Sequence, residues 1–117
     1  MKKVLIVDDE VEIVELMQML FEDDLEVLAA YDGQEALDVI AEHHPDLVVS
    51  DVMMPRLDGR EFCRRVKTDP ATSDIRVIMM SAVYNLDPQT CPADEIIRKP
   101  FDIHSVTEIV NRYLDMP

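Results

Sequence analysis

Aspartates stand at the ends of two short apolar runs in this chain of 117 residues. Asp8 and Asp9 close the run VLIVDDE, and Asp51 closes the apolar part of DLVVSDVMMP. If both runs are neighbouring parallel strands, the three carboxylates emerge at the same edge of one sheet. Like charges this close raise each other's pKa, and a hard divalent cation such as Mg²⁺ relieves their repulsion. The pattern therefore predicts a magnesium site at this edge.

Two further polar side chains close apolar runs later in the chain. Ser81 ends the run VIMMS, and Lys99 follows IIR in IIRKPF. A carboxylate beside a metal can attack phosphorus when fixed donors neutralise the charge that builds on the phosphoryl oxygens. Ser81 and Lys99 can supply such donors. A lysine considered alone is more often a surface residue paired with an acid, but the position of Lys99 at the end of the fifth strand favours the site. The residues together predict a metal and phosphate site at which a carboxylate can attack phosphorus.

Apolar runs alternate with amphipathic stretches along the whole chain, as in β–α units that build a parallel sheet covered on both faces. The predicted strands are residues 3–8, 25–30, 46–50, 76–81 and 95–98. The predicted helices are residues 11–22, a helix that starts after Asp32 and Gly33, and residues 59–69 and 103–114. In a sheet of order 2-1-3-4-5, ligands bind between strands one and three. Asp8, Asp9 and Asp51 fall at that place.

Two features of the intervening segments refine this expectation. Pro88 and Pro92 stand between the fourth and fifth strands, where proline disfavours a helix interior. The fourth helix is therefore expected to be short or unwound. The third helix carries a basic run that is expected to face solvent, while Asp58 before it suits a helix cap rather than the metal site. The basic residues are Arg60, Arg64, Arg65 and Lys67.

The composition indicates one globular domain with an acidic surface. The length suits a single core, and no apolar run approaches the ~20 residues that span a bilayer, so no membrane segment is predicted. The formal net charge of −14 repels phosphate, which argues against direct binding of nucleic acid. Cys63 and Cys91 lack metal-ligand spacing and are predicted to be thiols of a reducing, cytoplasmic compartment.

The motifs and their order resemble the receiver domains of two-component response regulators. The resemblance rests on Asp8-Asp9, Asp51 with Met53-Met54-Pro55, Asp58-Gly59, Ser81-Ala82 and Lys99-Pro100-Phe101. It implies one receiver domain over residues 1–117, with a flavodoxin-like three-layer fold. It also implies that the domain takes a phosphoryl group from the phosphohistidine of a sensor histidine kinase or phosphotransfer protein. The domain would then act on a downstream protein or fused output domain, without being an enzyme beyond its own phosphorylation and dephosphorylation.

The same resemblance implies a role for each site residue. Asp51 would be the phosphoacceptor, with Ser81 hydrogen-bonded to the phosphoryl group and Lys99 paired with it. Asp9 would bind Mg²⁺ directly, and Asp8 would support the ion mainly through water. The implied metal ligands are Asp8, Asp9, Asp51 and the backbone carbonyl of Met53.

The chain departs from the family pattern on the output side. The interval from Ser81 to Lys99 is shorter than is usual, and Ile96 stands where the family often has an aromatic residue that rotates on activation. These departures predict altered output with complete phosphorylation chemistry.

Two other classes of function are considered. A receiver-like scaffold that works without phosphorylation would keep the acids but take no phosphoryl label. A hydrolase of the aspartyl-phosphatase type would need an Asp-x-Asp pair, whereas Asp8 and Asp9 are adjacent. Mg²⁺-dependent labelling separates the switch from the scaffold.

Overall fold

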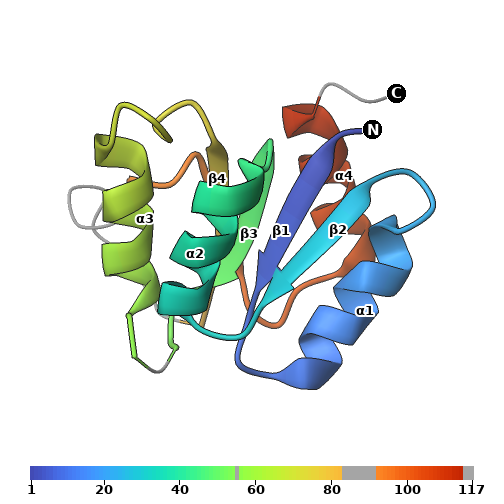
Figure 1. Ribbon diagram of the computed structural model, residues 1–117. Helices are drawn as coiled ribbons and strands as arrows, with labels where there is room; N and C mark the ends of the chain where they lie inside the picture. Colours follow the sequence, from blue (N-terminus) through green and yellow to red (C-terminus); the bar gives the residue numbers. More distant parts are fainter. Residues whose placement is uncertain (55, 83–91, 115–117) are drawn as a thin grey trace.

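The structure, a computed structural model, describes residues 1–54, 56–82 and 92–114. Within these residues a parallel sheet is covered by helices on both faces (Figure 1). The strands are β1 (Lys3–Val7), β2 (Glu26–Ala30), β3 (Leu47–Asp51), β4 (Arg76–Ser81) and β5 (Glu95–Arg98). The helices are α1 (Val11–Phe21), α2 (Gly33–His43), α3 (Gly59–Thr68) and α4 (Ile103–Tyr113). The order β2-β1-β3-β4-β5 confirms the predicted flavodoxin-like class.

Two apolar cores lie on opposite faces of the sheet. Helices α1 and α4 cover one face of the sheet, and α2 and α3 cover the other (Figure 1). Successive residues of a strand point to opposite faces, so Val4 and Ile6 of β1 enter the core under α1 and α4, while Leu5 and Val7 enter the other core. All four side chains are buried. Burial on both faces explains why β1, β3 and β4 read as continuous apolar runs. Because these strands are parallel neighbours, their carboxyl ends meet at one edge of the sheet.

The expectation of a short or unwound fourth helix concerns residues 83–91, which lie outside the described residues, as does Cys91. The expectation that the basic run of α3 faces solvent holds for its arginines. It is wrong for Lys67, whose side chain is only 16% exposed and pairs with Asp94. The long aliphatic stem of lysine lies along apolar surface and carries the ammonium inward to that partner. Among the described helices, none has the length and apolar character to cross a membrane.

Candidate functional site

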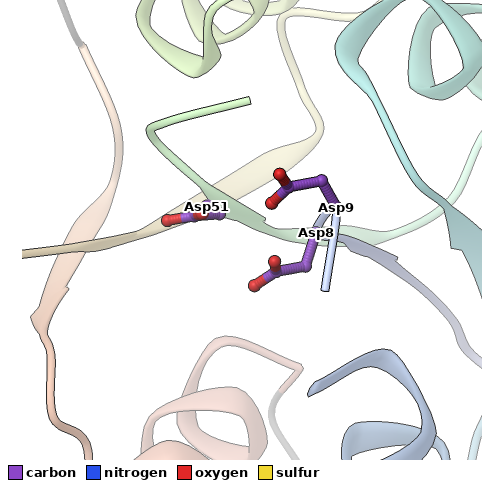
Figure 2. Close-up of side chains that lie close together, drawn as sticks. All are labelled: Asp8, Asp9 and Asp51. Carbon is purple, nitrogen blue, oxygen red and sulfur yellow. The ribbon is translucent and has the colours of Figure 1, made fainter. Parts of the chain in front are cut away.

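Asp8, Asp9 and Asp51 lie together at the carboxyl ends of β1 and β3, as predicted (Figure 2). The two strands are neighbours, with Val7 opposite Ser50 in the parallel register. One carboxylate oxygen from each aspartate lies within 4.8 Å of the others. We call these three residues the acidic cluster. Carboxylate oxygens are ligands that Mg²⁺ prefers.

Asp8 is the most deeply placed member of the acidic cluster. Its side chain is 0% exposed, and Oδ1 accepts a hydrogen bond of 2.9 Å from the backbone N–H of Glu10. Oδ2 has no hydrogen-bond partner among the described residues. Burial raises the pKa of Asp8 to about 6, although the Glu10 N–H and the charge of Lys99 act in the opposite direction. A buried carboxylate oxygen with an open position suits a hard cation as a ligand.

Lys99 brings a positive charge to the acidic cluster from the end of β5. Its Nζ lies 3.2 Å from Asp51 Oδ1 and 3.6 Å from Asp8 Oδ2, and its side chain is 20% exposed. Burial lowers the pKa of Lys99, but the attraction of Asp8 and Asp51 outweighs burial and raises it. The lysine therefore stays protonated, with its ammonium close to two carboxylates that could also bind a metal. The Lys99–Pro100 peptide bond is cis.

Asp51 is fixed by the start of α3, which lies directly against it. Its Oδ1 accepts a hydrogen bond of 2.9 Å from the Val52 N–H. The Gly59 N–H donates to the Val52 carbonyl at 2.8 Å, and a Cβ on Gly59 would lie only 2.4 Å from the Asp51 carbonyl oxygen. Only glycine permits this approach. Asp58 caps α3 by accepting from Arg60 N–H, as predicted.

Ser81 and Met53 flank the acidic cluster. Ser81 is the buried last residue of β4, one position beyond Met80, which is opposite Asp51 in the register. Met53 follows Asp51 by two residues, and its side chain is exposed. The roles of the Ser81 hydroxyl and the Met53 carbonyl stay predictions. The structure thus brings Lys99 and the three aspartates together, with the other two predicted residues beside them.

Glu10 is a residue of this region that the sequence reasoning missed. Together with Lys99 it lines a cleft of about 480 Å³ whose other walls are mostly apolar. It precedes α1 without making a side-chain cap to that helix in the described structure, and its charge raises the pKa of both Asp8 and Lys99. The run of three acids, DDE, was the available signal. The remaining lining residues are Ile13, Ala82, Pro100 and Phe101.

Asp8→Asn is expected to stabilise the metal-free protein at pH 7. The folded pKa of Asp8, about 6, lies above the ordinary value of 3.8, so the folded state binds more protons between these values and stability falls as pH rises through them. Asparagine keeps an oxygen that accepts from the Glu10 N–H, and it removes the buried charge. The free energy of unfolding at pH 7 should therefore rise by about 1–3 kcal/mol. Urea unfolding in chelator should show this gain at pH 7 and not at pH 3.5. An equal gain at both pH values would contradict the account.

Comparison with known proteins gives a consistent result. The sequence model described as the response regulator receiver domain matches residues 4–111. The chain is 40% identical over 105 residues to a probable transcriptional regulator, ycf27, of Cyanophora paradoxa. The aligned region covers 86% of this chain and 43% of that protein. The chain spans less than half the length of the curated relatives it matches.

Solved structures with similar folds include two of particular interest. The signal receiver domain of a signal transduction histidine kinase from Syntrophus aciditrophicus has a TM-score of 0.89 and 30% identity, over 98% of this chain and 91% of that one. The response regulator protein TrrA from Thermotoga maritima, in complex with Mg²⁺-BeF, has a TM-score of 0.83 and 31% identity, over 97% of this chain and 99% of that one.

Proposed function

Because the chain belongs to the response regulator receiver domain family, it is a phosphoacceptor switch of two-component signalling, and we propose that Asp51 is the residue phosphorylated. The observation that carries this assignment is the position of Asp51. It is the buried last residue of the central strand β3, it belongs to the acidic cluster, and it lies 3.2 Å from the Lys99 ammonium.

The transfer we propose is from a phosphohistidine to the Asp51 carboxylate. Oδ1 of Asp51 already accepts from Val52 N–H and pairs with Lys99, so Oδ2 is the attacking oxygen. As the new O–P bond forms, the P–N bond breaks and its electron pair returns to the ring nitrogen. A phosphohistidine that is protonated on its other ring nitrogen therefore leaves as neutral imidazole, and no further proton has to move. Lys99 and Ser81 balance the charge on the phosphoryl oxygens. A bound Mg²⁺ would neutralise the remaining charge between the acceptor and the phosphoryl group.

The acidic cluster fits Mg²⁺, and we propose Asp8, Asp9, Asp51 and the Met53 carbonyl as its protein ligands. Three converging carboxylate oxygens and the open position on Asp8 Oδ2 support this assignment. The chain is 31% identical to TrrA, whose structure holds Mg²⁺-BeF.

Asp9→Ala is expected to weaken Mg²⁺ binding by about tenfold or more, because a hard cation loses a charged oxygen ligand. Asp9 is exposed, so the substitution should leave stability in chelator unchanged or higher. Glu12→Ala is the matched control, since it removes an exposed acid three residues away that lies outside the cluster. Titration calorimetry measures both affinities. Equal weakening in the two variants would indicate general electrostatics instead of a ligand.

We further propose the partners and the compartment. The cleft beside Lys99 offers apolar walls and open access next to the acidic cluster, which suits the approach of a histidine from a sensor histidine kinase or phosphotransfer protein. Relatives named as transcriptional regulators are more than twice as long, which supports control of a downstream protein or fused output domain. The net charge of −14 argues against DNA contact by this domain itself. A domain with such partners works in the cytoplasm and catalyses no reaction beyond its own phosphorylation and dephosphorylation.

Incubation with acetyl phosphate tests the switch against the scaffold. Mass spectrometry should detect one phosphoryl group that requires Mg²⁺ and is removed by hydroxylamine, as expected for an acyl phosphate. Absence of any label with Mg²⁺ present, in a folded protein, would favour a scaffold that works without phosphorylation.

A further inference from the structure

β5 is the strand that delivers Lys99, and it has little support of its own. It has four residues, Glu95–Arg98, of which only Ile97 is buried, and it pairs with β4 alone in the described part of the chain. Edge strands with little buried surface have weakly specified register. Whatever fixes β5 therefore also fixes the distance from Lys99 to the acidic cluster.

Asp94, the residue before β5, holds the start of this strand through two hydrogen bonds to one residue. Its backbone N–H donates to the Val77 carbonyl at 2.8 Å, and its Oδ2 accepts from the Val77 N–H at 2.8 Å. At the other end, the Lys99 N–H donates to the Ser81 carbonyl at 2.8 Å. The pairing of β5 with β4 is thus closed at both ends, by Asp94 and by Lys99.

Asp94 is itself held from three directions. Lys67 of α3 places Nζ 3.0 Å from Asp94 Oδ2, and Arg76 of β4 places Nη1 3.4 Å from Oδ1. The Tyr113 hydroxyl of α4 donates to the Asp94 carbonyl at 2.8 Å. Burial alone would raise the pKa of Asp94, but the Val77 N–H and Lys67 outweigh it and lower that pKa. The carboxylate is therefore ionised and immobilised, far along β5 from the acidic cluster.

We propose that Asp94 is a positioning residue for Lys99: by fixing the register of β5 on β4, it places the Lys99 ammonium beside Asp51. The proposal rests on the proposed role of Lys99 in phosphoryl transfer. A slip of one residue would move Lys99 by about 3.3 Å and turn its side chain to the other face of the sheet. Smaller displacements would lengthen the 3.2 Å separation between Lys99 Nζ and Asp51 Oδ1.

The same arrangement occurs once more in the sheet and supplies a matched control. Asp46, before β3, donates its N–H to the Lys3 carbonyl at 2.9 Å and accepts from the Lys3 N–H through Oδ2 at 2.8 Å. Unlike β5, β3 lies between two strands and all five of its residues are buried. Its register is fixed without Asp46. Asp46→Ala and Asp94→Ala should therefore remove the same kind of hydrogen bond. Only Asp94→Ala should let a residue of the site, Lys99, change its position.

The first test compares phosphorylation rates from acetyl phosphate at saturating Mg²⁺. Asp94→Ala is expected to slow the maximal rate about tenfold, because small errors of placement are costly in group transfer. The Mg²⁺ concentration for half-maximal rate should not rise, since the proposed ligands lie on β1, β3 and the loop after β3. Asp94→Asn keeps an oxygen acceptor for Val77 N–H and should recover most of the rate. Asp46→Ala should keep the wild-type rate although it loses the corresponding hydrogen bond from the Lys3 N–H.

The second test locates Lys99 without phosphorylation. In ¹H–¹⁵N spectra of the metal-free protein, the amide and ammonium signals of Lys99 should shift in Asp94→Ala and stay in place in Asp46→Ala. Unshifted Lys99 signals in Asp94→Ala, or equal slowing by the two alanine variants, would overturn the positioning role. Shifted signals in a protein that takes no label would instead refute the proposed function and leave the positioning role standing. If Asp94→Ala does not fold, Lys67→Met is used instead, because it removes the ammonium that holds Asp94 Oδ2. It should slow phosphorylation and shift the Lys99 signals, and the absence of both effects would overturn the positioning role.

Discussion

Asp51→Asn is expected to abolish acid-labile phosphorylation and to leave the fold intact. An amide oxygen does not act as the nucleophile, and among the described residues no other carboxylate combines the end of a central buried strand with the 3.2 Å approach of Lys99. The asparagine oxygen can still accept from Val52 N–H, so the local backbone keeps its hydrogen bond. Mass spectrometry of the protein after incubation with acetyl phosphate and Mg²⁺ measures the loss.

Asp58→Asn is the matched control for this experiment. It changes the same functional group seven positions along the chain, at a residue that caps α3 and lies outside the acidic cluster. Asparagine is also a good helix cap, so stability should hold. Full labelling of Asp58→Asn together with no labelling of Asp51→Asn is the expected pair of results. Label that persists in Asp51→Asn, on Asp8 or Asp9 for example, would refute the assignment.

The position of the acidic cluster could be predicted from the sequence because it depends on only two physical rules. Continuous apolar runs indicate strands buried on both faces, and parallel strands place their carboxyl ends at one edge. Asp8, Asp9, Asp51 and Lys99 follow such runs directly, so their meeting depends on strand order and not on side-chain detail. The observed order and the distances at Lys99 confirm that part of the prediction.

The support around the site could not be predicted in the same way. Lys67 was expected to face solvent because a basic helical run usually does, and its inward path depends on Asp94, a partner 27 residues away. Asp46 and Asp94 each stand directly before a strand, where aspartate is an ordinary turn residue. Their shared hydrogen-bonding role becomes visible only when the neighbouring strand is in place. Sequence periodicity specifies which strands form, whereas the register of an edge strand depends on such individual contacts.

Lys99→Met is expected to change two properties in opposite directions. Methionine keeps much of the stem and removes the ammonium that lies between Asp8 and Asp51, so Mg²⁺ no longer competes with a resident positive charge. Mg²⁺ affinity should rise by severalfold or more. The phosphorylation rate should fall by about 100-fold, as when one preorganised donor is removed from a transition state.

Stability gives a third measure of the same change. In chelator, Lys99→Met leaves two buried carboxylates without their cationic partner and should lose about 1–3 kcal/mol. Mg²⁺ should restore much of this loss, because a ligand that binds only the folded state stabilises it. Lys99→Arg is the control, since it keeps the charge and should keep the Mg²⁺ affinity near that of the wild type. Unchanged Mg²⁺ affinity in Lys99→Met would show that the lysine does not compete with the metal.

The double variant Asp94→Ala/Lys99→Met connects this prediction with the register of β5. If Asp94 acts on phosphoryl transfer only by placing Lys99, its substitution has nothing further to misplace once the ammonium is gone. The double variant should then react no more slowly than Lys99→Met alone, although its unfolding midpoint should be lower. Multiplicative slowing would mean that Asp94 affects the site by another route, since independent effects add in free energy. The non-additivity of these two substitutions therefore measures how far the 3.2 Å separation between Lys99 and Asp51 depends on a carboxylate at the opposite end of β5.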